Sequence, residues 1–185
     1  MDTDALYQER LARILKAINL EPVDRVPVIY IGGAFSPRYM GASLARYCMD
    51  MDFAVETTLA AVKRLGGIDG LNGLPGARIH VMLTLLWLSH LDIPGRELPE
   101  DSLWQVHEAE VMQASEYDTI IEKGWIPFRN EYLPRVLDMD EFKLTMEWIQ
   151  TNGTRVAQLF RDEGLVTIRG GITSIPFEFL CGARS

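Results

Sequence analysis

Arg38 and Tyr39 are adjacent side chains of types that bind small molecules, and they follow the double glycine Gly32-Gly33. A guanidinium at this position could hold a carboxylate or phosphate in bidentate fashion. A solvated loop arginine is an equally good interpretation, and a loop tyrosine often only packs. The pair therefore predicts a substrate-binding position, with a surface role as its alternative.

Asn72 and His80 are the next candidate substrate-binding residues along the chain. Asn72 could present its amide to a ligand, although Asx residues beside glycine usually stabilise turns. The same two interpretations hold for Asp69, as a turn former or an acceptor of N–H groups. His80 stands among apolar residues, which is more typical of a packed, hydrogen-bonded histidine than of a ligand.

Glu178 is the one candidate for acid–base catalysis, because it lies between Phe177 and Phe179. An apolar setting raises the pKa of a carboxyl group and suits it to proton transfer. A surface position is the favoured alternative. We expect Cys48 and Cys181 to be inert thiols, because they lie far apart and form neither a disulfide framework nor a zinc motif.

The charge balance argues against nucleic-acid binding. The net charge is −8 and the acidic residues are scattered along helix-like segments, with no basic stripe. No run of 18 apolar residues is present to span a membrane. The acidic start of the chain lacks the features of a signal peptide, so we expect a cytoplasmic location.

Apolar periodicity and glycine stops predict a mixed set of elements. Helices are expected over residues 4–18, 52–65, 102–113, 116–123 and 140–163, buried strands over 26–31 and 165–168, and a further short strand over 68–73 that runs into a loop. Thr3 or Asp4 would cap the first helix, and Gly153 would permit close packing of the last. Residues 81–88 fit a strand or a helix, and residues 125–128 fit a strand or a connector. This order predicts an α/β fold with parallel strands.

The segment from Arg13 to Val28 resembles the opening of uroporphyrinogen decarboxylase-like proteins, through its Pro22-Val23-Asp24-Arg25-Val26-Pro27-Val28 turn. The resemblance implies a (β/α)₈ TIM barrel. Such a barrel typically needs about 250 residues. It therefore implies that residues 1–185 are a single domain forming the N-terminal half of a barrel.

A second segment is similar to the corrinoid-linked methyltransferase branch of that superfamily. It comprises Pro94-Gly95-Arg96-Glu97-Leu98-Pro99-Glu100-Asp101, Trp104-Gln105 and the stretch from Glu116 to Gly124. The resemblance implies methyl transfer between a corrinoid (cobalamin) carrier and a small acceptor. The branch holds zinc through a His-x-Cys pair and a later cysteine in its C-terminal half. No histidine of this chain has a cysteine two residues on, so we expect this chain alone to hold neither cofactor.

Departures from the decarboxylase pattern weigh against the alternative of uroporphyrinogen decarboxylation. Where the decarboxylases have an Arg-Gln-Ala-Gly-Arg-Tyr motif, Arg38-Tyr39 matches the last two residues, but Gly32 replaces the first arginine. The loop from Asn72 to Ala77 lacks the carboxylate of that family. A further alternative is an inactive half-barrel that associates with itself or with a complementary half-barrel, because exposed strand edges favour association.

Overall fold

A computed structural model describes residues 2–168 and Ala183, which fall into two compact units. The sheet unit comprises described residues within 1–43, 50–76 and 149–171. The helical unit comprises those within 44–49, 77–148 and 172–185. One long helix, α8 (Met139–Arg161), contributes its first part to the helical unit and its second part to the sheet unit.

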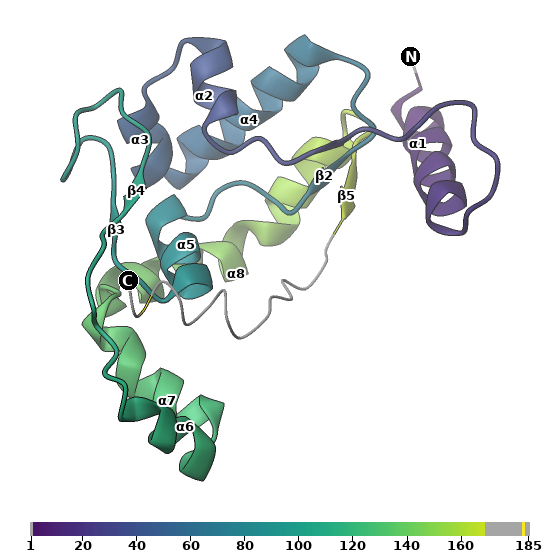
Figure 1. The fold of residues 1–185 in the computed structure, drawn as a ribbon. Helices are drawn as coiled ribbons and strands as arrows, with labels where there is room; N and C mark the ends of the chain where they lie inside the picture. Colours follow the sequence, from purple (N-terminus) through teal and green to yellow (C-terminus); the bar gives the residue numbers. More distant parts are fainter. Residues whose placement is uncertain (1, 169–182, 184–185) are drawn as a thin grey trace. The chain divides into compact units, whose positions relative to one another are not determined.

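The sheet unit is built on three short parallel strands in the order β1-β2-β5 (Figure 1). The strands are β1 (Ile29–Tyr30), β2 (Gly70–Asn72) and β5 (Val166–Ile168), and both pairings are parallel. The order of the strands in the sheet is thus their order along the chain. The predicted α/β class and parallel sheet are confirmed.

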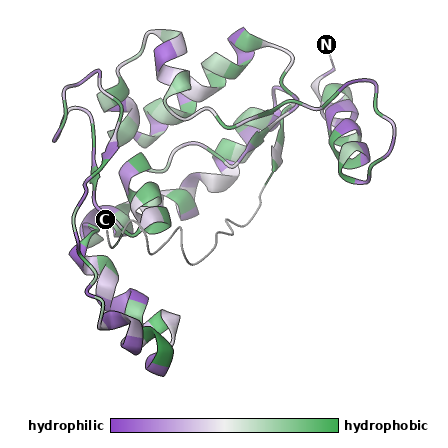
Figure 2. Cartoon of the chain, in the orientation of Figure 1, coloured by the Kyte–Doolittle hydropathy of each residue, from purple (hydrophilic) through white to green (hydrophobic). Residues whose placement is uncertain are grey.

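Helices α1 (Thr3–Ile18), α2 (Phe35–Met40) and α4 (Met51–Leu65) complete the sheet unit with the end of α8. Figure 2 shows apolar and polar residues interspersed along α1, as its predicted periodicity requires. The predicted cap was wrong, because Asp2 accepts hydrogen bonds from the N–H groups of Asp4 and Ala5. A carboxylate one residue earlier reaches two free N–H groups of the first turn.

The first strand is shorter and less buried than predicted. Val26 and Ile31 are 79% and 76% exposed, so the expectation of burial on both faces was wrong. Pro27 has no N–H to donate, and the N–H of Val28 donates to the Asp69 carboxylate instead of to a neighbouring strand. Strand pairing therefore begins only at Ile29.

The helical unit contains α3 (Leu44–Met49), α5 (Ile79–Trp87), α6 (Glu116–Lys123) and α7 (Trp125–Tyr132). A short 3₁₀ turn, Leu133–Arg135, follows α7. The helix predicted over 116–123 is confirmed, and the ambiguous 81–88 segment is largely helical. Residues 125–128 belong to a helix rather than to a strand or connector. Phe128 and Tyr132, one helical turn apart, stack at 5.4 Å within the core of this unit.

The helix predicted over residues 102–113 was wrong. This region instead contains the short strand β4 (Gln105–Val106), which pairs antiparallel with β3 (Leu91–Asp92). The Ser102 hydroxyl donates to the Pro99 carbonyl, so it caps no helix. The packing role expected for Gly153 was also wrong, because among the described residues a Cβ at this position would meet no atom of another element within 4 Å.

Candidate functional site

A buried carboxylate, Asp69, joins the three strands at their amino ends. Its side chain is fully buried and accepts hydrogen bonds from Arg13 Nη1 at 2.6 Å and from Arg25 Nη1 and Nη2 at 2.6 and 2.7 Å. Its N–H donates to the Val28 carbonyl, and its carbonyl accepts from the Val166 N–H. We call Arg13, Asp24, Arg25 and Asp69 the Asp69 network.

Asp24 extends the network toward solvent. Arg13 Nε and Nη2 donate to its two carboxylate oxygens at 2.8 and 2.9 Å. The hydrogen bonds from Arg13 lower the pKa of Asp24 to about 2. Burial acts to raise the pKa of Asp69, but the hydrogen bonds from Arg25, Val28 and Arg13 prevail and lower it. Asp69 is thereby held ionised, as a buried charge with two cationic partners requires.

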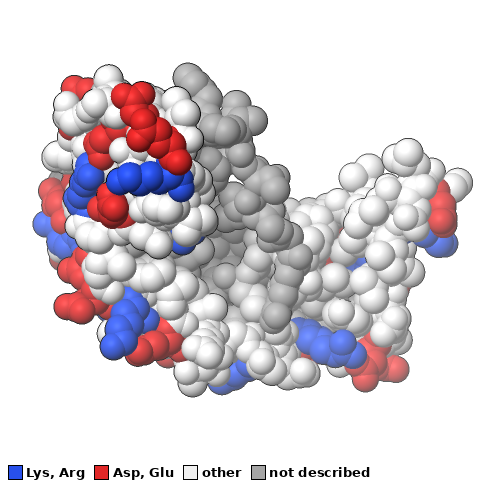
Figure 3. Space-filling model, turned by 90° about the horizontal axis from the view of Figure 1, so that it is seen from below, with Lys and Arg blue, Asp and Glu red and all other residues white. Residues whose placement is uncertain are grey.

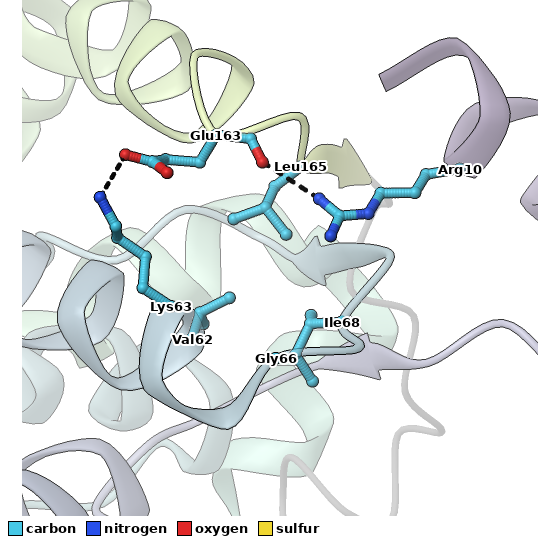
Figure 4. A pocket seen from close by; sticks show the side chains of 7 residues that line it. All are labelled: Arg10, Val62, Lys63, Gly66, Ile68, Glu163 and Leu165. Carbon is cyan, nitrogen blue, oxygen red and sulfur yellow. Dashed lines mark hydrogen bonds and ion pairs between the residues drawn. The ribbon is translucent and has the colours of Figure 1, made fainter. Parts of the chain in front are cut away.

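A pocket of about 210 Å³ also lies at the amino-end side of the sheet, beside Ile68 and Leu165 (Figure 4). Arg10 enters it and donates to the carbonyls of Glu163 and Gly164, and Lys63 pairs with the Glu163 carboxylate at 2.5 Å. These contacts satisfy carbonyls at the end of α8. The polar groups of this pocket therefore stabilise the join between α8 and β5.

The carboxyl ends of the strands carry the sequence-predicted residues Arg38, Tyr39 and Asn72. Asn72 is exposed at the end of β2. Arg38 and Tyr39 lie on the short helix α2 rather than in the expected loop, and Arg38 is exposed. The Tyr39 ring stacks on Phe35 at 5.3 Å, and the Arg64 guanidinium lies 4.8 Å from its centre. Tyr39 thus packs against Phe35 and Arg64, as its alternative interpretation predicts.

Gly32 occupies a position with no room for a side chain. Its φ is +80°, and an added Cβ would lie 2.6 Å from Tyr30 Cε1 and 2.9 Å from Ser36 Oγ. The Tyr30 hydroxyl and Ser36 Oγ are hydrogen-bonded at 2.8 Å, which fixes both neighbours. A side chain at residue 32 would require this pair to separate.

His80 lies in a second pocket, within the helical unit, of about 200 Å³. We call it the His80 pocket. Its lining residues come from α5, the β3 region and the start of α8: His80, Thr84, His90, Leu91, Arg96, Glu97, Val136, Leu137, Asp138 and Glu141. His80 is 4% exposed, and its Nε2 lies 2.5 Å from Glu141 Oε2.

Glu141 is held by three cationic or hydrogen-bonding side chains. Arg78 Nη1 donates to its Oε1 at 3.0 Å, and Arg96 Nη1 donates to its Oε2 at 3.3 Å, beside His80. Asp138 accepts from the N–H groups of Asp140 and Glu141 and so caps the first turn of α8. The position of the Glu141 carboxylate is therefore set both by its helix and by its partners.

The protonation of His80 follows from these contacts. A carboxylate only accepts hydrogen bonds, so Nε2 carries the proton and donates it to Glu141. Burial lowers the pKa of His80, and the opposing effect of Glu141 does not restore it. The neutral ring then presents Nδ1 as an acceptor. Nδ1 is buried and has no hydrogen-bond partner among the residues that the structure describes.

His90 and His107 lie together on the β3–β4 pair. Their side chains are 45% and 56% exposed, and their rings meet edge to face at 5.9 Å. His107 Nδ1 lies 3.2 Å from Asp92 Oδ2. Within residues 2–168 and at Ala183, no three His, Cys, Asp or Glu side chains are grouped so that they could hold a metal ion.

Of the remaining predicted residues, the structure describes Cys48 but not the others. Cys48 is buried, and burial raises the pKa of its thiol to about 12, which makes it the inert thiol that was expected. Glu178 and Cys181 lie outside the described residues. None of the helices that the structure describes has the length and apolar character needed to cross a membrane.

Charged side chains are interspersed on the surface. On the face drawn in Figure 3, Lys and Arg side chains lie beside Asp and Glu side chains.

In comparisons with known proteins, no family model, no curated protein and no solved structure matches the chain.

Proposed function

We propose that this chain is part of a corrinoid-dependent methyltransferase of the uroporphyrinogen decarboxylase-like superfamily and forms the first strands of its barrel. Three parallel strands in chain order, with helices between them, are the arrangement with which a (β/α)₈ barrel begins. The sites of such barrels lie at the carboxyl ends of the strands. Arg38 and Asn72 are therefore the proposed substrate-binding residues, and the Asp69 network at the opposite ends is structural.

The observation that favours methyl transfer over decarboxylation is the lack of space at Gly32. The decarboxylase motif has its first arginine at this position. Here even a Cβ would collide with Tyr30 and Ser36, so the local backbone is built for glycine. A chain shaped in this way keeps Arg38 as the counterpart of the second arginine of that motif but has none for the first at residue 32.

The segment that resembles the methyltransferase branch also contributes to a pocket. Arg96 and Glu97 both line the His80 pocket, and Glu97 Oε2 accepts from the N–H of Ile93 at 2.9 Å. Gly95 packs so closely against Ala45 that an added Cβ would lie 2.6 Å from the Ala45 Cβ. The segment is thus held in place beside candidate ligand-binding side chains.

The zinc of this branch finds no ligand set in the part of the chain that the structure describes. We therefore assign neither zinc nor corrinoid to a residue of this chain. The proposal is tested on the protein purified intact from its source cells, with zinc and a small thiol as methyl acceptor. Conversion of methylcobalamin, followed by its absorbance, is the expected result.

A parallel assay with uroporphyrinogen separates the first alternative. Release of carbon dioxide without methyl transfer would establish decarboxylation and overturn the proposal. A protein that acts on neither compound would overturn both activities. It would favour the alternative of an inactive chain that associates with another chain. Exposed apolar side chains of the sheet unit support that alternative: Ile18, Leu20, Val26 and Ile31 are 68–94% exposed.

Association has its own structural support and its own test. Within the described residues, β1 and β5 each pair only with β2, so each leaves one edge open. Open edges beside exposed apolar side chains favour pairing with another chain. Sedimentation is expected to give a dimer or larger assembly, and a monodisperse monomer with cooperative unfolding would contradict it.

A further inference from the structure

Arg10 is a half-buried arginine that forms no ion pair with any described residue. Its Nη1 donates to the carbonyls of Glu163 and Gly164, which uses both N–H groups of that nitrogen. Nε and Nη2 donate to no group of the described chain, and the described atoms leave neither of them fully enclosed. Of the five N–H donors of a guanidinium, those on Nε and Nη2 therefore remain open to a ligand.

The sheet unit holds no carboxylate that could be the missing partner of Arg10. The residues of this unit that the structure does not describe have no acidic side chain: Met1, Arg169, Gly170 and Gly171. Burial lowers the pKa of Arg10, and attraction from Asp69 does not offset it. Arg10 is thus a partly desolvated cation without a counter-ion in contact, and such a group favours the binding of an anion.

Arg10 lines the pocket of about 210 Å³ beside Ile68 and Leu165, which we call the Arg10 pocket (Figure 4). We infer that the Arg10 pocket binds a small monocarboxylate, whose two oxygens accept hydrogen bonds from Nε and Nη2 of Arg10. The N–H groups of these two nitrogens form a fork that matches a carboxylate. The pocket lies at the amino-end side of the sheet, so the inference does not depend on the proposed methyl transfer.

The charges of the lining favour a ligand with one negative charge. Its charged residues are Arg10, Lys63 and Glu163, two cations and one carboxylate, which leaves a net charge of +1. Lys63 pairs with the Glu163 carboxylate at 2.5 Å, so these two charges compensate each other and Arg10 supplies the excess. A cation would be repelled by this guanidinium, and a dianion would exceed its charge.

The remaining lining residues select the other end of the ligand. Val62, Ile68 and Leu165 form apolar walls of the pocket (Figure 4). Pockets for drug-sized ligands measure roughly 300–1,000 Å³, more than the volume of this pocket. The ligand class is therefore a carboxylate on a compact apolar group, rather than a nucleotide or inorganic phosphate.

The test uses benzoate as the probe and the full chain labelled with ¹⁵N-arginine. Benzoate is a monoanion at neutral pH and carries its carboxylate on one apolar ring. The Nε–H resonance of Arg10 is assigned through the backbone resonances of residue 10. The expected result is a saturable shift of this resonance with added benzoate, while the Nε–H resonance of Arg155 stays unchanged.

Benzamide is the matched comparison for the ligand. It has the same ring and nearly the same shape, but it is uncharged and its NH₂ group cannot accept from the guanidinium. We expect it to bind about tenfold more weakly, because hydrogen bonds to a charged acceptor are roughly twice as strong as neutral ones.

Two variants provide the comparison for the protein. Arg10→Lys keeps the positive charge but lacks the fork of Nε and Nη2, and we expect benzoate to bind it about tenfold more weakly in calorimetric titration. Arg155→Gln removes an arginine of α8 that pairs with Asp52 and does not line the pocket. Benzoate should bind Arg155→Gln with wild-type affinity.

The inference is overturned if benzoate causes no saturable shift of the Arg10 Nε–H resonance, as expected if water alone fills the pocket. It is also overturned if benzoate and benzamide bind with equal affinity, because the carboxylate would then be irrelevant. Both results come from the wild-type chain, so they hold even if Arg10→Lys fails to fold.

Discussion

Arg25 and Asp69 form a two-pronged ion pair in which Nη1 and Nη2 lie 2.6 and 2.7 Å from the two carboxylate oxygens. Asp69 is fully buried, whereas the Arg25 side chain is 41% exposed. The pair connects the turn before β1 to the residue before β2, and Arg13 of α1 joins it from the interior. Removing the carboxylate would leave the Arg25 guanidinium without its carboxylate partner and would take one of three from Arg13, which keeps Glu9 and Asp24.

Asp69→Asn should lower the free energy of unfolding by about 3 kcal/mol, because breaking a buried pair strands its charged partners. Urea denaturation followed by circular dichroism would measure the change. Glu9→Gln is the matched control, since Glu9 also pairs with Arg13 but is 62% exposed. Its cost should stay below about 1 kcal/mol. Equal effects of the two substitutions would contradict a structural role for the buried carboxylate.

The network also predicts how stability depends on pH. The folded-state pKa values of Asp24 and Asp69 lie below the usual value of about 4. At a pH between the folded-state pKa of these groups and the usual pKa of the unfolded chain, the unfolded chain binds more protons than the folded one. Stability therefore rises with pH in this range. The contribution is complete above pH 4 and is lost as the pH falls toward 2. Stability measured across this range should fall less steeply in Asp24→Asn than in wild type.

Gly32→Ala should destabilise the chain more than Gly73→Ala. Both glycines have positive φ, +80° and +84°, so both substitutions carry the same backbone strain of about 1–2 kcal/mol. Among the residues that the structure describes, the new Cβ meets Tyr30 and Ser36 at residue 32, whereas at residue 73 it meets no atom within 4 Å. The overpacking should add about 1–3 kcal/mol. Chemical denaturation of the two variants would reveal the difference, and identical costs would refute the steric argument.

Cys48 should resist alkylation in the folded chain. Its thiol is 1% exposed, and its pKa of about 12 leaves little thiolate at pH 8. Iodoacetamide treatment followed by peptide mass spectrometry should find the Cys48 peptide unmodified until the chain is denatured with guanidinium chloride. Modification at the same rate in both states would show that the thiol is accessible.

Local spacing predicted the elements whose signal is local. The helices now seen as α1, α4, α6 and α8 each carry apolar residues on one face, and glycines follow α4 and α6. The error at residues 102–113 has a local cause as well. Ser102 and Gln105 have the spacing of a capping box but no apolar stripe follows them, so the strand pairing with Leu91 and Asp92 decides the conformation.

Contacts between residues far apart in the sequence could not be predicted from local spacing. Arg13 and Asp69 are separated by 56 residues, and His80 and Glu141 are separated by 61. One signal was present nevertheless: Asp69 lies inside a segment predicted to be a strand, and a carboxylate buried in a sheet requires a cationic partner. Glu141 offered no such signal, because a glutamate in the first turn of a helix is ordinary.

The strands of the sheet unit have their charged network at one end and their candidate substrate-binding residues at the other. Asp69 precedes Gly70, whereas Asn72 closes the same strand only three residues later. Because the Asp69 network does not include the carboxyl-end residues, variation at Arg38 and Asn72 leaves its contacts in place. A library randomised at these two positions could therefore explore new specificities while most of its members still fold.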